Sequence, residues 1–169
     1  ATRIVGGILF HSVYYYEYKN PGSLATNEYN KLGSPASHGC IRLTVADAKW
    51  IYDNCPVGTT VVIYDDKSSP GPLGKPEAIK LHASVRWDPT DPGKDNPYKS
   101  KKPQLYGVKN KSVPWGSELN LLEGITAKSS VGTDITKSIN VKGKADTNIP
   151  GTYSITYSVK DALGRTAAK

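Results

Sequence analysis

The residues most able to do chemistry lie in the segment Ser37-His38-Gly39-Cys40. A cysteine thiolate is a strong nucleophile, and it needs a base such as histidine to take its proton. The chain has three histidines: His11, His38 and His82. Gly39 allows a tight turn and a close backbone approach to a substrate. The pattern favours nucleophilic catalysis by Cys40, although a buried, inert cysteine beside a histidine is the commoner arrangement in proteins.

The predicted secondary structure places Cys40 between a long loop and a helix. Residues 3–10 are apolar enough for a strand that ends at His11, and residues 14–36 carry the turn signals of a loop. Thr44 is a good N-cap, with an acidic residue in the capping-box position. A helix N-terminus lowers the pKa of a nearby thiol, so we expect this helix to activate Cys40. His11 can return beside Cys40 if the flanking strands are neighbours.

The predicted helix has one apolar face and is followed by a strand. Val45, Ala48, Tyr52 and Cys55 recur at helical spacing. Because Cys55 shares this face, we expect it to be a buried, inert thiol. Residues 60–64 are rich in β-branched side chains and predict a strand.

The composition changes after residue 66. Ten of the 22 Lys and Arg residues, but four of the 15 Asp and Glu residues, lie between 67 and 114, together with most of the prolines. This predicts a solvated linker with some ordered pieces, among them a strand over 78–87. The functional alternative is attraction to a polyanion such as an anionic wall polymer. The charge does not lie on a helix face or an aromatic platform, which argues against nucleic acid as a partner.

The last third of the chain predicts a second β unit. Tyr153, Ile155, Tyr157 and Val159 alternate with polar residues, which is the pattern of a strand with one buried face. Short strands are also expected at three places: 119–122, 125–128 and 139–142. Several short strands separated by turns favour a small sandwich. Because this unit contains neither His nor Cys, we expect that its removal leaves the catalytic reaction intact.

Residues 8–66 resemble the catalytic domain of the L,D-transpeptidase (YkuD-like) family. A histidine at a strand end, a polar loop and then Ser37-His38-Gly39-Cys40-Ile41-Arg42 follow the signature of that family. The resemblance implies several strands before the histidine strand, whereas only ten residues precede His11. We therefore expect the sequence to begin inside the catalytic domain, so that either the missing strands lie elsewhere or this piece is inactive.

Residues 105–169 resemble the Ig-like repeats of bacterial surface proteins. The resemblance lies in Gly124-Ile125-Thr126-Ala127, Pro150-Gly151-Thr152-Tyr153 and the segment 159–164. The expected fold is mainly β: a partial L,D-transpeptidase catalytic fold with one short helix, and a small Ig-like sandwich. The expected boundaries are 1–66 for the catalytic part, 67–114 for the linker and 115–169 for the Ig-like domain, and truncation after residue 66 is expected to spare the chemistry.

The first resemblance implies a role for each residue of the signature. Cys40 would be the nucleophile, and His11 the base that activates it. Ser37 and His38 would shape the site, and backbone N–H groups at Gly39 and Cys40 would hold an oxyanion. The candidate substrate contacts are Arg42, Ser12 and Tyr14. For the arginine two interpretations are open, a partner for a substrate carboxylate and a structural ion pair.

The implied reaction cross-links peptidoglycan stem peptides through a Cys40 acyl-enzyme, with L,D-carboxypeptidase activity when water is the acceptor. No metal or organic cofactor is implied, since His and Cys never recur at zinc-ligand spacing. The alternatives are a sortase-like cysteine transpeptidase, whose arginine lies further from its cysteine than Arg42 does, and a non-catalytic surface-binding module. The expected location is extracytoplasmic, at the cell wall or secreted, and the sequence has no apolar stretch near the roughly 20 residues that cross a bilayer.

Overall fold

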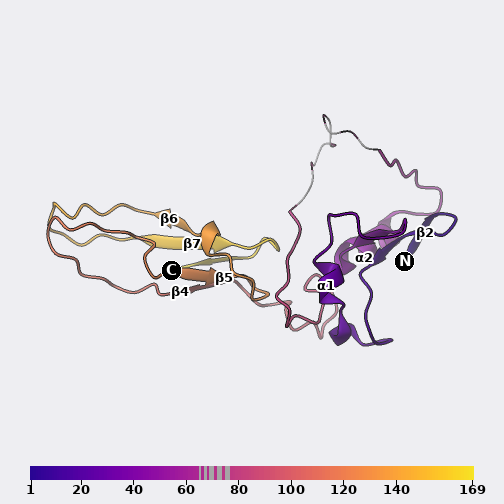
Figure 1. The fold of residues 1–169 in the computed structure, drawn as a ribbon, viewed down its shortest axis with the longest axis horizontal. Coiled ribbons are helices and arrows are strands. Elements are labelled where there is room, and N and C mark those ends of the chain that lie inside the picture. Colours follow the sequence, from indigo (N-terminus) through magenta and orange to yellow (C-terminus); the bar gives the residue numbers. More distant parts are fainter. Residues whose placement is uncertain (65, 67, 69–70, 72–73, 75–76) are drawn as a thin grey trace. The chain divides into compact units, whose positions relative to one another are not determined.

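The computed structural model describes residues 1–64, 66, 68, 71, 74 and 77–169. The chain divides into two compact units, residues 1–100 and 101–169 (Figure 1). With 20% strand and 12% helix, it is mainly β, as the sequence predicts.

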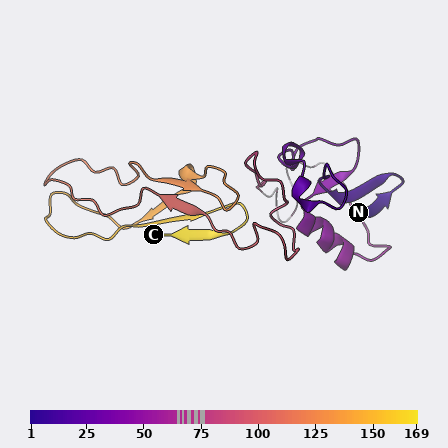
Figure 2. The same cartoon turned by 90° about the horizontal axis from the view of Figure 1, so that it is seen from below.

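The first unit contains a three-stranded sheet with one helix against it. The strand order is β1-β2-β3, with β1 antiparallel and β3 parallel to the central strand. The longer helix lies against β1 and β2 (Figure 2, purple coiled ribbon). The elements are β1 (Thr2–Val5), β2 (Ile8–Ser12), the 3₁₀ turn η1 (Pro21–Ser23), α1 (Thr26–Tyr29), β3 (Ile41–Leu43) and α2 (Val45–Asn54).

The single strand predicted over residues 3–10 is in fact a hairpin. Gly6 adopts a φ of +52°, a left-handed conformation that glycine adopts readily, and Gly6-Gly7 reverse the chain between β1 and β2. The apolar residues of this run do not indicate where the chain reverses. The only local signal of the turn is the pair Gly6-Gly7. The reversal makes β2 the central strand and places His11 within it.

The start of the predicted helix is confirmed, but its apolar face is not. The Thr44 hydroxyl accepts the N–H of Asp47 at 3.1 Å, the capping contact that the sequence indicates. However, the side chain of Tyr52 is 70% exposed, and none of the residues of α2 is fully buried. Helical spacing identifies a stripe of apolar residues, but the neighbouring elements decide whether that stripe is covered.

The strand predicted over residues 60–64 is wrong. These residues are all described, and they form an irregular, exposed segment in which Val62 and Ile63 are 72% and 70% exposed. A strand exists only where a neighbour supplies the other half of its hydrogen-bond ladder, and β-branched composition cannot supply that neighbour.

The segment from residue 77 to residue 100 packs on the first unit instead of forming a free linker. Leu81 and Val85 are buried together with Val13, Leu24 and Tyr29. The strand expected over 78–87, a range that the structure describes throughout, is replaced by coil and a turn. The start of the expected linker, between 67 and 76, lies largely outside the described residues. The first compact unit therefore extends to residue 100, beyond the end at residue 66 that the sequence analysis expects for the catalytic part.

The second unit is a small sandwich, as predicted. A two-stranded sheet β4-β5 and a three-stranded sheet β6-β7-β8 enclose Leu105, Ile125, Ala127, Tyr157 and Val159. The expected strands near 125 and 139 are present, while residues 119–122, which are all described, include turn and coil but no strand. The elements are β4 (Gln104–Tyr106), β5 (Thr126–Lys128), η2 (Thr136–Ser138), β6 (Asn140–Lys142), β7 (Thr156–Lys160) and β8 (Thr166–Ala168).

The predicted alternation is confirmed only for the second half of the expected strand, since β7 begins at Thr156 and Tyr153 lies outside it, 39% exposed. Tyr157 and Val159 are buried in the core, and Lys160 is exposed on the other side. The missed strand β4 lay inside the expected linker, although its central residue Leu105 is only 3% exposed. Within the described part of the chain, none of the helices is long and apolar enough to span a membrane.

Candidate active site

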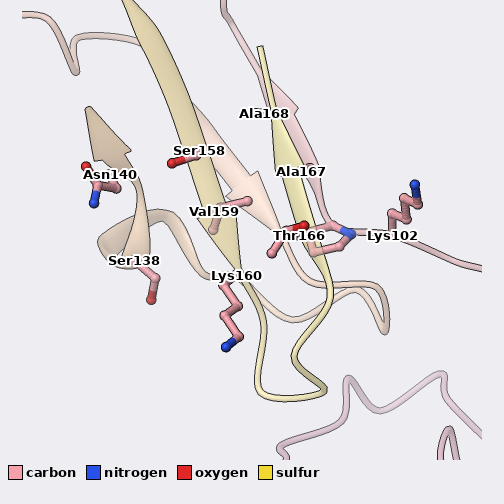
Figure 3. A pocket seen from close by; sticks show the side chains of 10 residues that line it. Lys102, Ser138, Asn140, Ser158, Val159, Lys160, Thr166, Ala167 and Ala168 are labelled. Atoms are coloured by element: carbon pink, nitrogen blue, oxygen red, sulfur yellow. The ribbon is translucent and has the colours of Figure 1, made fainter. Parts of the chain in front are cut away.

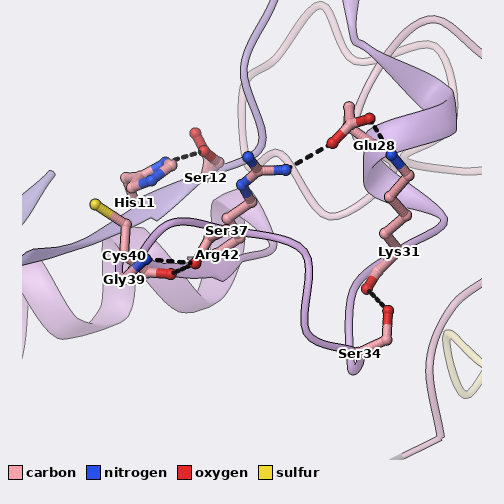
Figure 4. Close-up of polar contacts among 9 residues, drawn as sticks. All are labelled: His11, Ser12, Glu28, Lys31, Ser34, Ser37, Gly39, Cys40 and Arg42. Atoms are coloured by element: carbon pink, nitrogen blue, oxygen red, sulfur yellow. Dashed lines mark hydrogen bonds and ion pairs between the residues drawn. The ribbon is translucent and has the colours of Figure 1, made fainter.

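The parallel pairing of β2 with β3 brings the candidate nucleophile and base together. The register pairs Phe10 with Ile41 and His11 with Arg42. Cys40 directly precedes β3, so it lies beside the residues of β2 just before His11. Because alternate residues of a strand face the same side, the side chains of Cys40, Arg42 and His11 share one face of the sheet. Figure 4 shows the thiol and the imidazole next to each other.

The imidazole of His11 is oriented by the backbone. Its Nδ1 lies 2.7 Å from the carbonyl oxygen of Ser12. A carbonyl can only accept a hydrogen bond, so Nδ1 carries a proton, and in the neutral imidazole Nε2 then keeps its lone pair. This tautomer leaves Nε2 able to take a proton from a neighbouring group. The group that orients the His11 ring is therefore the backbone carbonyl of Ser12.

The turn before Cys40 is held by Ser37. The Ser37 hydroxyl donates to the carbonyl oxygen of Cys40 at 2.6 Å and accepts the N–H of Gly39 at 3.2 Å. Gly39 has a φ of +142°, and a Cβ at this position would lie 2.5 Å from Cδ1 of Ile8. The backbone conformation favours glycine here, whereas the contact with the flexible end of the Ile8 side chain could be relieved by a change of its rotamer. The thiol itself is half-buried, with Sγ 3.7 Å from the carbonyl oxygen of Gly7.

The expected activation of Cys40 by the helix N-terminus is wrong. Three residues of β3 and then Thr44 separate Cys40 from the start of α2, which at about 3.3 Å per strand residue is more than one helical turn away. The first N–H groups of α2 are also already used, since Val45 donates to Asp88 and Ala46 donates to Thr90. The sequence shows that a helix follows, but not that a strand intervenes.

Arg42 forms a structural ion pair, one of the two interpretations left open by the sequence. Its Nη1 lies 2.7 Å from Oε2 of Glu28, and Nζ of Lys31 lies 2.5 Å from Oε1 of the same carboxylate (Figure 4). The hydrogen bonds from Lys31 and then Arg42 lower the pKa of Glu28, so it stays ionised at neutral pH. Because Glu28 is on α1, this pair ties the loop between β2 and β3 to the strand that follows Cys40.

A cleft of about 520 Å³ opens beside this cluster. Its walls include Cys40, Arg42, Glu28 and Lys31, so the space next to the thiol is lined by two cations and one anion. Four other predicted site residues are not among the residues that line it: His11, Ser12, Tyr14 and His38. His38 is exposed on the turn, and Tyr14 is 47% exposed and packs edge-to-face on Tyr16 with ring centroids 5.8 Å apart.

Sequence reasoning missed Glu28, Lys31 and the residues around Asp88. No motif marks Glu28 or Lys31, which lie in a polar loop, and their contact with Arg42 depends on how that loop returns to the sheet. The one available signal was Arg42 itself, because a half-buried guanidinium needs an anion. The described residues contain no group of three His, Cys, Asp or Glu side chains that could hold a metal ion.

A larger hollow, of about 790 Å³, lies on the second unit (Figure 3). It runs over β6, β7 and β8, and its lining includes Lys102, Lys160, Asn140 and Ser158. It contains neither a nucleophile with a base nor a titratable pair. Its lining carries two lysines but neither a carboxylate nor a cysteine, so we place the candidate chemistry in the smaller cleft.

Comparison with known proteins agrees with this division. Residues 1–63 match the family described as L,D-transpeptidase catalytic domain (YkuD). Residues 103–169 match the family described as bacterial surface protein, Ig-like domain. The Bacillus subtilis (strain 168) protein named "Putative L,D-transpeptidase YciB" is 52% identical over 58 residues, which cover 34% of this chain and 28% of that protein.

The matched stretch of that relative is thus about a quarter of its length. Within the present chain the two family matches do not overlap, and the segment 64–102 lies between them. The catalytic-domain match contains both His11 and Cys40, and the Ig-like match contains all five strands of the sandwich. The chain therefore carries a segment that matches the L,D-transpeptidase catalytic-domain family, residues 1–63, followed by a segment that matches the bacterial surface Ig-like family, residues 103–169.

Proposed function

We propose that the protein is a peptidoglycan L,D-transpeptidase that acts through a thioester on Cys40. The main support is the strand register, which brings His11 and Cys40 to one face of the sheet within the segment that matches the catalytic family. The tautomer of His11 adds to this, since Nε2 is left as a proton acceptor. The family and the Ig-like domain of the surface-protein type point to an extracytoplasmic location.

The proposed reaction has two balanced steps. In the first, His11 takes the thiol proton, and the Cys40 sulfur attacks the carbonyl carbon of the third stem residue, an L-centre. The C–S bond forms, the peptide C–N bond breaks, and the terminal D-residue leaves as an amine that takes the proton from His11. In the second, an amine of a neighbouring stem attacks the thioester and gives a proton to His11, so that a C–N bond replaces the C–S bond, and the released Cys40 thiolate takes that proton back as the thiol. Water as acceptor gives a carboxylic acid instead.

The residues around the thiol have distinct proposed roles in these steps. Because the Gly39 N–H already donates to Ser37, the N–H of Cys40 is the better candidate to hold the oxyanion. Ser37 shapes the turn, and His38, Ser12 and Tyr14 are left as candidate substrate contacts at the rim. Lys31 and Arg42 give the cleft an excess of one positive charge over Glu28, which suits a substrate carboxylate.

The direct test is to trap the acyl-enzyme. The full-length protein is incubated with a soluble tetrapeptide stem and an amine acceptor, and the tryptic peptides are analysed by mass spectrometry. We expect release of the terminal D-residue, a tripeptide adduct on the peptide that contains Cys40, and a cross-linked product. A sortase-like activity would instead cleave a protein sorting signal, and a non-catalytic module would form no adduct with either substrate.

We also propose that the Ig-like unit holds the enzyme on its wall substrate, with the hollow bordered by Lys102 and Lys160 as its contact for anionic wall polymers. Truncation after Ser100 is then expected to spare turnover of a soluble stem and to weaken retention on isolated walls. The reason is that the first unit keeps its whole core when the cut falls at residue 100.

Truncation after Asp66 is the contrasting case, and here the structure reverses the expectation from the sequence. This cut removes Leu81 and Val85, and burying each such side chain contributes about 1.5–3 kcal/mol. The total stability of a domain is about 5–15 kcal/mol. We therefore expect the protein truncated after Asp66 to unfold at a much lower urea concentration than the protein truncated after Ser100, and to lose turnover. Equal stability of the two truncated proteins would show that residues 77–100 are dispensable.

A further inference from the structure

The segment from Leu81 to Thr90, called here the bracing segment, lies beyond the match to the catalytic family, which ends at residue 63. It nevertheless packs into the first unit, and its Asp88 is fully buried. Burial raises the pKa of this carboxyl group. A buried carboxylate is costly unless it is well hydrogen-bonded, so the partners of Asp88 indicate what the segment does.

One set of contacts fixes the region of α1. The N–H of Leu24 donates to the carbonyl of Arg86 at 2.8 Å, and the Thr26 hydroxyl donates to the carbonyl of Val85. The side chain of Asn30 both donates to and accepts from the backbone of Leu81, at 2.9 and 2.7 Å. These contacts lie on both sides of Glu28, the residue that pairs with Arg42 on β3. The position of that ion pair therefore depends on the bracing segment.

A second set of contacts fixes the first turn of α2. Oδ2 of Asp88 accepts the N–H of Val45 at 2.8 Å, and Oγ1 of Thr90 accepts the N–H of Ala46 at 3.2 Å. Oδ1 of Asp88 accepts both the N–H and the hydroxyl of Thr90, at 2.8 and 2.6 Å. Two N–H groups that a helix start leaves without intrahelical partners are thus satisfied from the bracing segment.

Both sets of contacts act on the three residues of β3. This strand follows Cys40 directly, is joined to α2 through Thr44, and carries Arg42 at the residue that pairs with His11. A displacement of α2 or of Glu28 would shift β3 along β2 and change the distance between the thiol and the imidazole. We propose that the bracing segment is a positioning element of the Cys40 site and that Asp88 is its main positioning residue. The catalytic meaning of this proposal rests on the function proposed above.

The test compares four variants of the full-length protein. Asp88→Ala removes both acceptor oxygens, and Asp88→Asn keeps the shape and one acceptor. Thr90→Val removes the hydroxyl that accepts the N–H of Ala46 at 3.2 Å. Asp95→Ala is the matched control, because it removes an exposed carboxylate from the same stretch of chain. For each variant, kcat and KM are measured on a soluble stem at a temperature where urea titration shows the protein to be folded. Hydrogen exchange is followed at the amides of Val45 and Ala46.

We expect Asp88→Ala to lower kcat by about 10- to 100-fold, since small errors in the placement of reacting groups are costly. KM should stay nearly unchanged, Asp88→Asn should recover part of kcat, and the two amides should lose protection. Thr90→Val should show a smaller loss of kcat, which keeps the test decisive if Asp88→Ala does not fold. A folded Asp88→Ala or Thr90→Val variant with the kcat of the parent would overturn the proposal and leave the segment a purely structural role.

Failure of the proposed function is recognised separately. If the parent forms no acyl-enzyme, the readout becomes the rate at which iodoacetamide alkylates Cys40, resolved from Cys55 by peptide mass spectrometry. A bracing segment that positions β3 should change this rate at Cys40 in Asp88→Ala, with no change at Cys55 and none in Asp95→Ala. An unchanged rate at Cys40 in the folded variant would overturn the inference whatever the reaction is.

Discussion

Replacement of Cys40 by serine is expected to abolish cross-linking by the full-length protein while leaving its stability unchanged. Loss of a catalytic nucleophile removes the covalent intermediate altogether, so turnover should fall by more than about 100-fold. The thiol is half-buried, and Sγ makes a weak hydrogen bond to the carbonyl of Gly7 at 3.7 Å. The urea midpoint should therefore stay close to that of the parent, with a change in stability within about 0.5 kcal/mol.

Cys55→Ser is the matched control for this prediction. Cys55 is the C-cap of α2, and its contact there is made by its backbone N–H to the carbonyl of Ile51, which the substitution retains. We expect full turnover and the same tripeptide adduct on Cys40. Residual turnover above about 1% in Cys40→Ser, or a large loss in Cys55→Ser, would show that the wrong thiol has been assigned.

Replacement of His11 by alanine is expected to lower kcat by about 10²- to 10⁴-fold, the usual contribution of general acid–base assistance. The geometry supports this size of effect because Nδ1 is hydrogen-bonded to the Ser12 carbonyl, which leaves Nε2 as the proposed acceptor of the thiol proton. His11→Asn is the more informative variant, since an amide can still donate to that carbonyl but cannot take up a proton. Both variants should lose acyl-enzyme formation by mass spectrometry, measured with protein that circular dichroism shows to be folded.

His82→Ala is the control for the general base. The His82 side chain is exposed, and its Nδ1 contacts the hydroxyl of Ser84, two residues further along the chain. We expect the kcat of this variant to equal that of the parent. If His11→Asn kept its activity while His82→Ala lost it, the base would have to be sought in the segment after residue 77.

Features set by neighbouring residues could be predicted from the sequence. Thr44 caps α2 because its hydroxyl reaches the N–H three residues on, and Tyr157 and Val159 are buried because a strand alternates its faces. The signature around Cys40 is equally local, since Ser37 and Gly39 shape the turn through contacts within the turn itself. These interactions need only a few residues of chain, so their spacing is enough to predict them.

Two of the failed predictions concern contacts between distant parts of the chain. Residues 60–64 have the composition of a strand but lack a paired neighbour among the described residues. The segment after residue 77 has the composition of a linker, yet Leu81, Val85 and Asp88 are buried in the first unit. The composition of a segment indicates which secondary structure it favours by itself. Whether its side chains are buried depends on the elements that pack against it.

The sequence by itself determined which residues could react: a thiol on a glycine turn, a histidine on a strand, and a second β unit without either. The tertiary structure alone decided how they are placed. The parallel register of β2 and β3 sets His11 opposite Arg42, on the face of the sheet that also carries Cys40. The strand β3 separates the thiol from the helix that was expected to activate it. Glu28 pairs with Arg42 from 14 residues earlier in the chain, and Asp88 accepts the N–H of Val45 from 43 residues further on. Side-chain chemistry is encoded residue by residue, but the distance between two groups depends on the path of the whole chain between them.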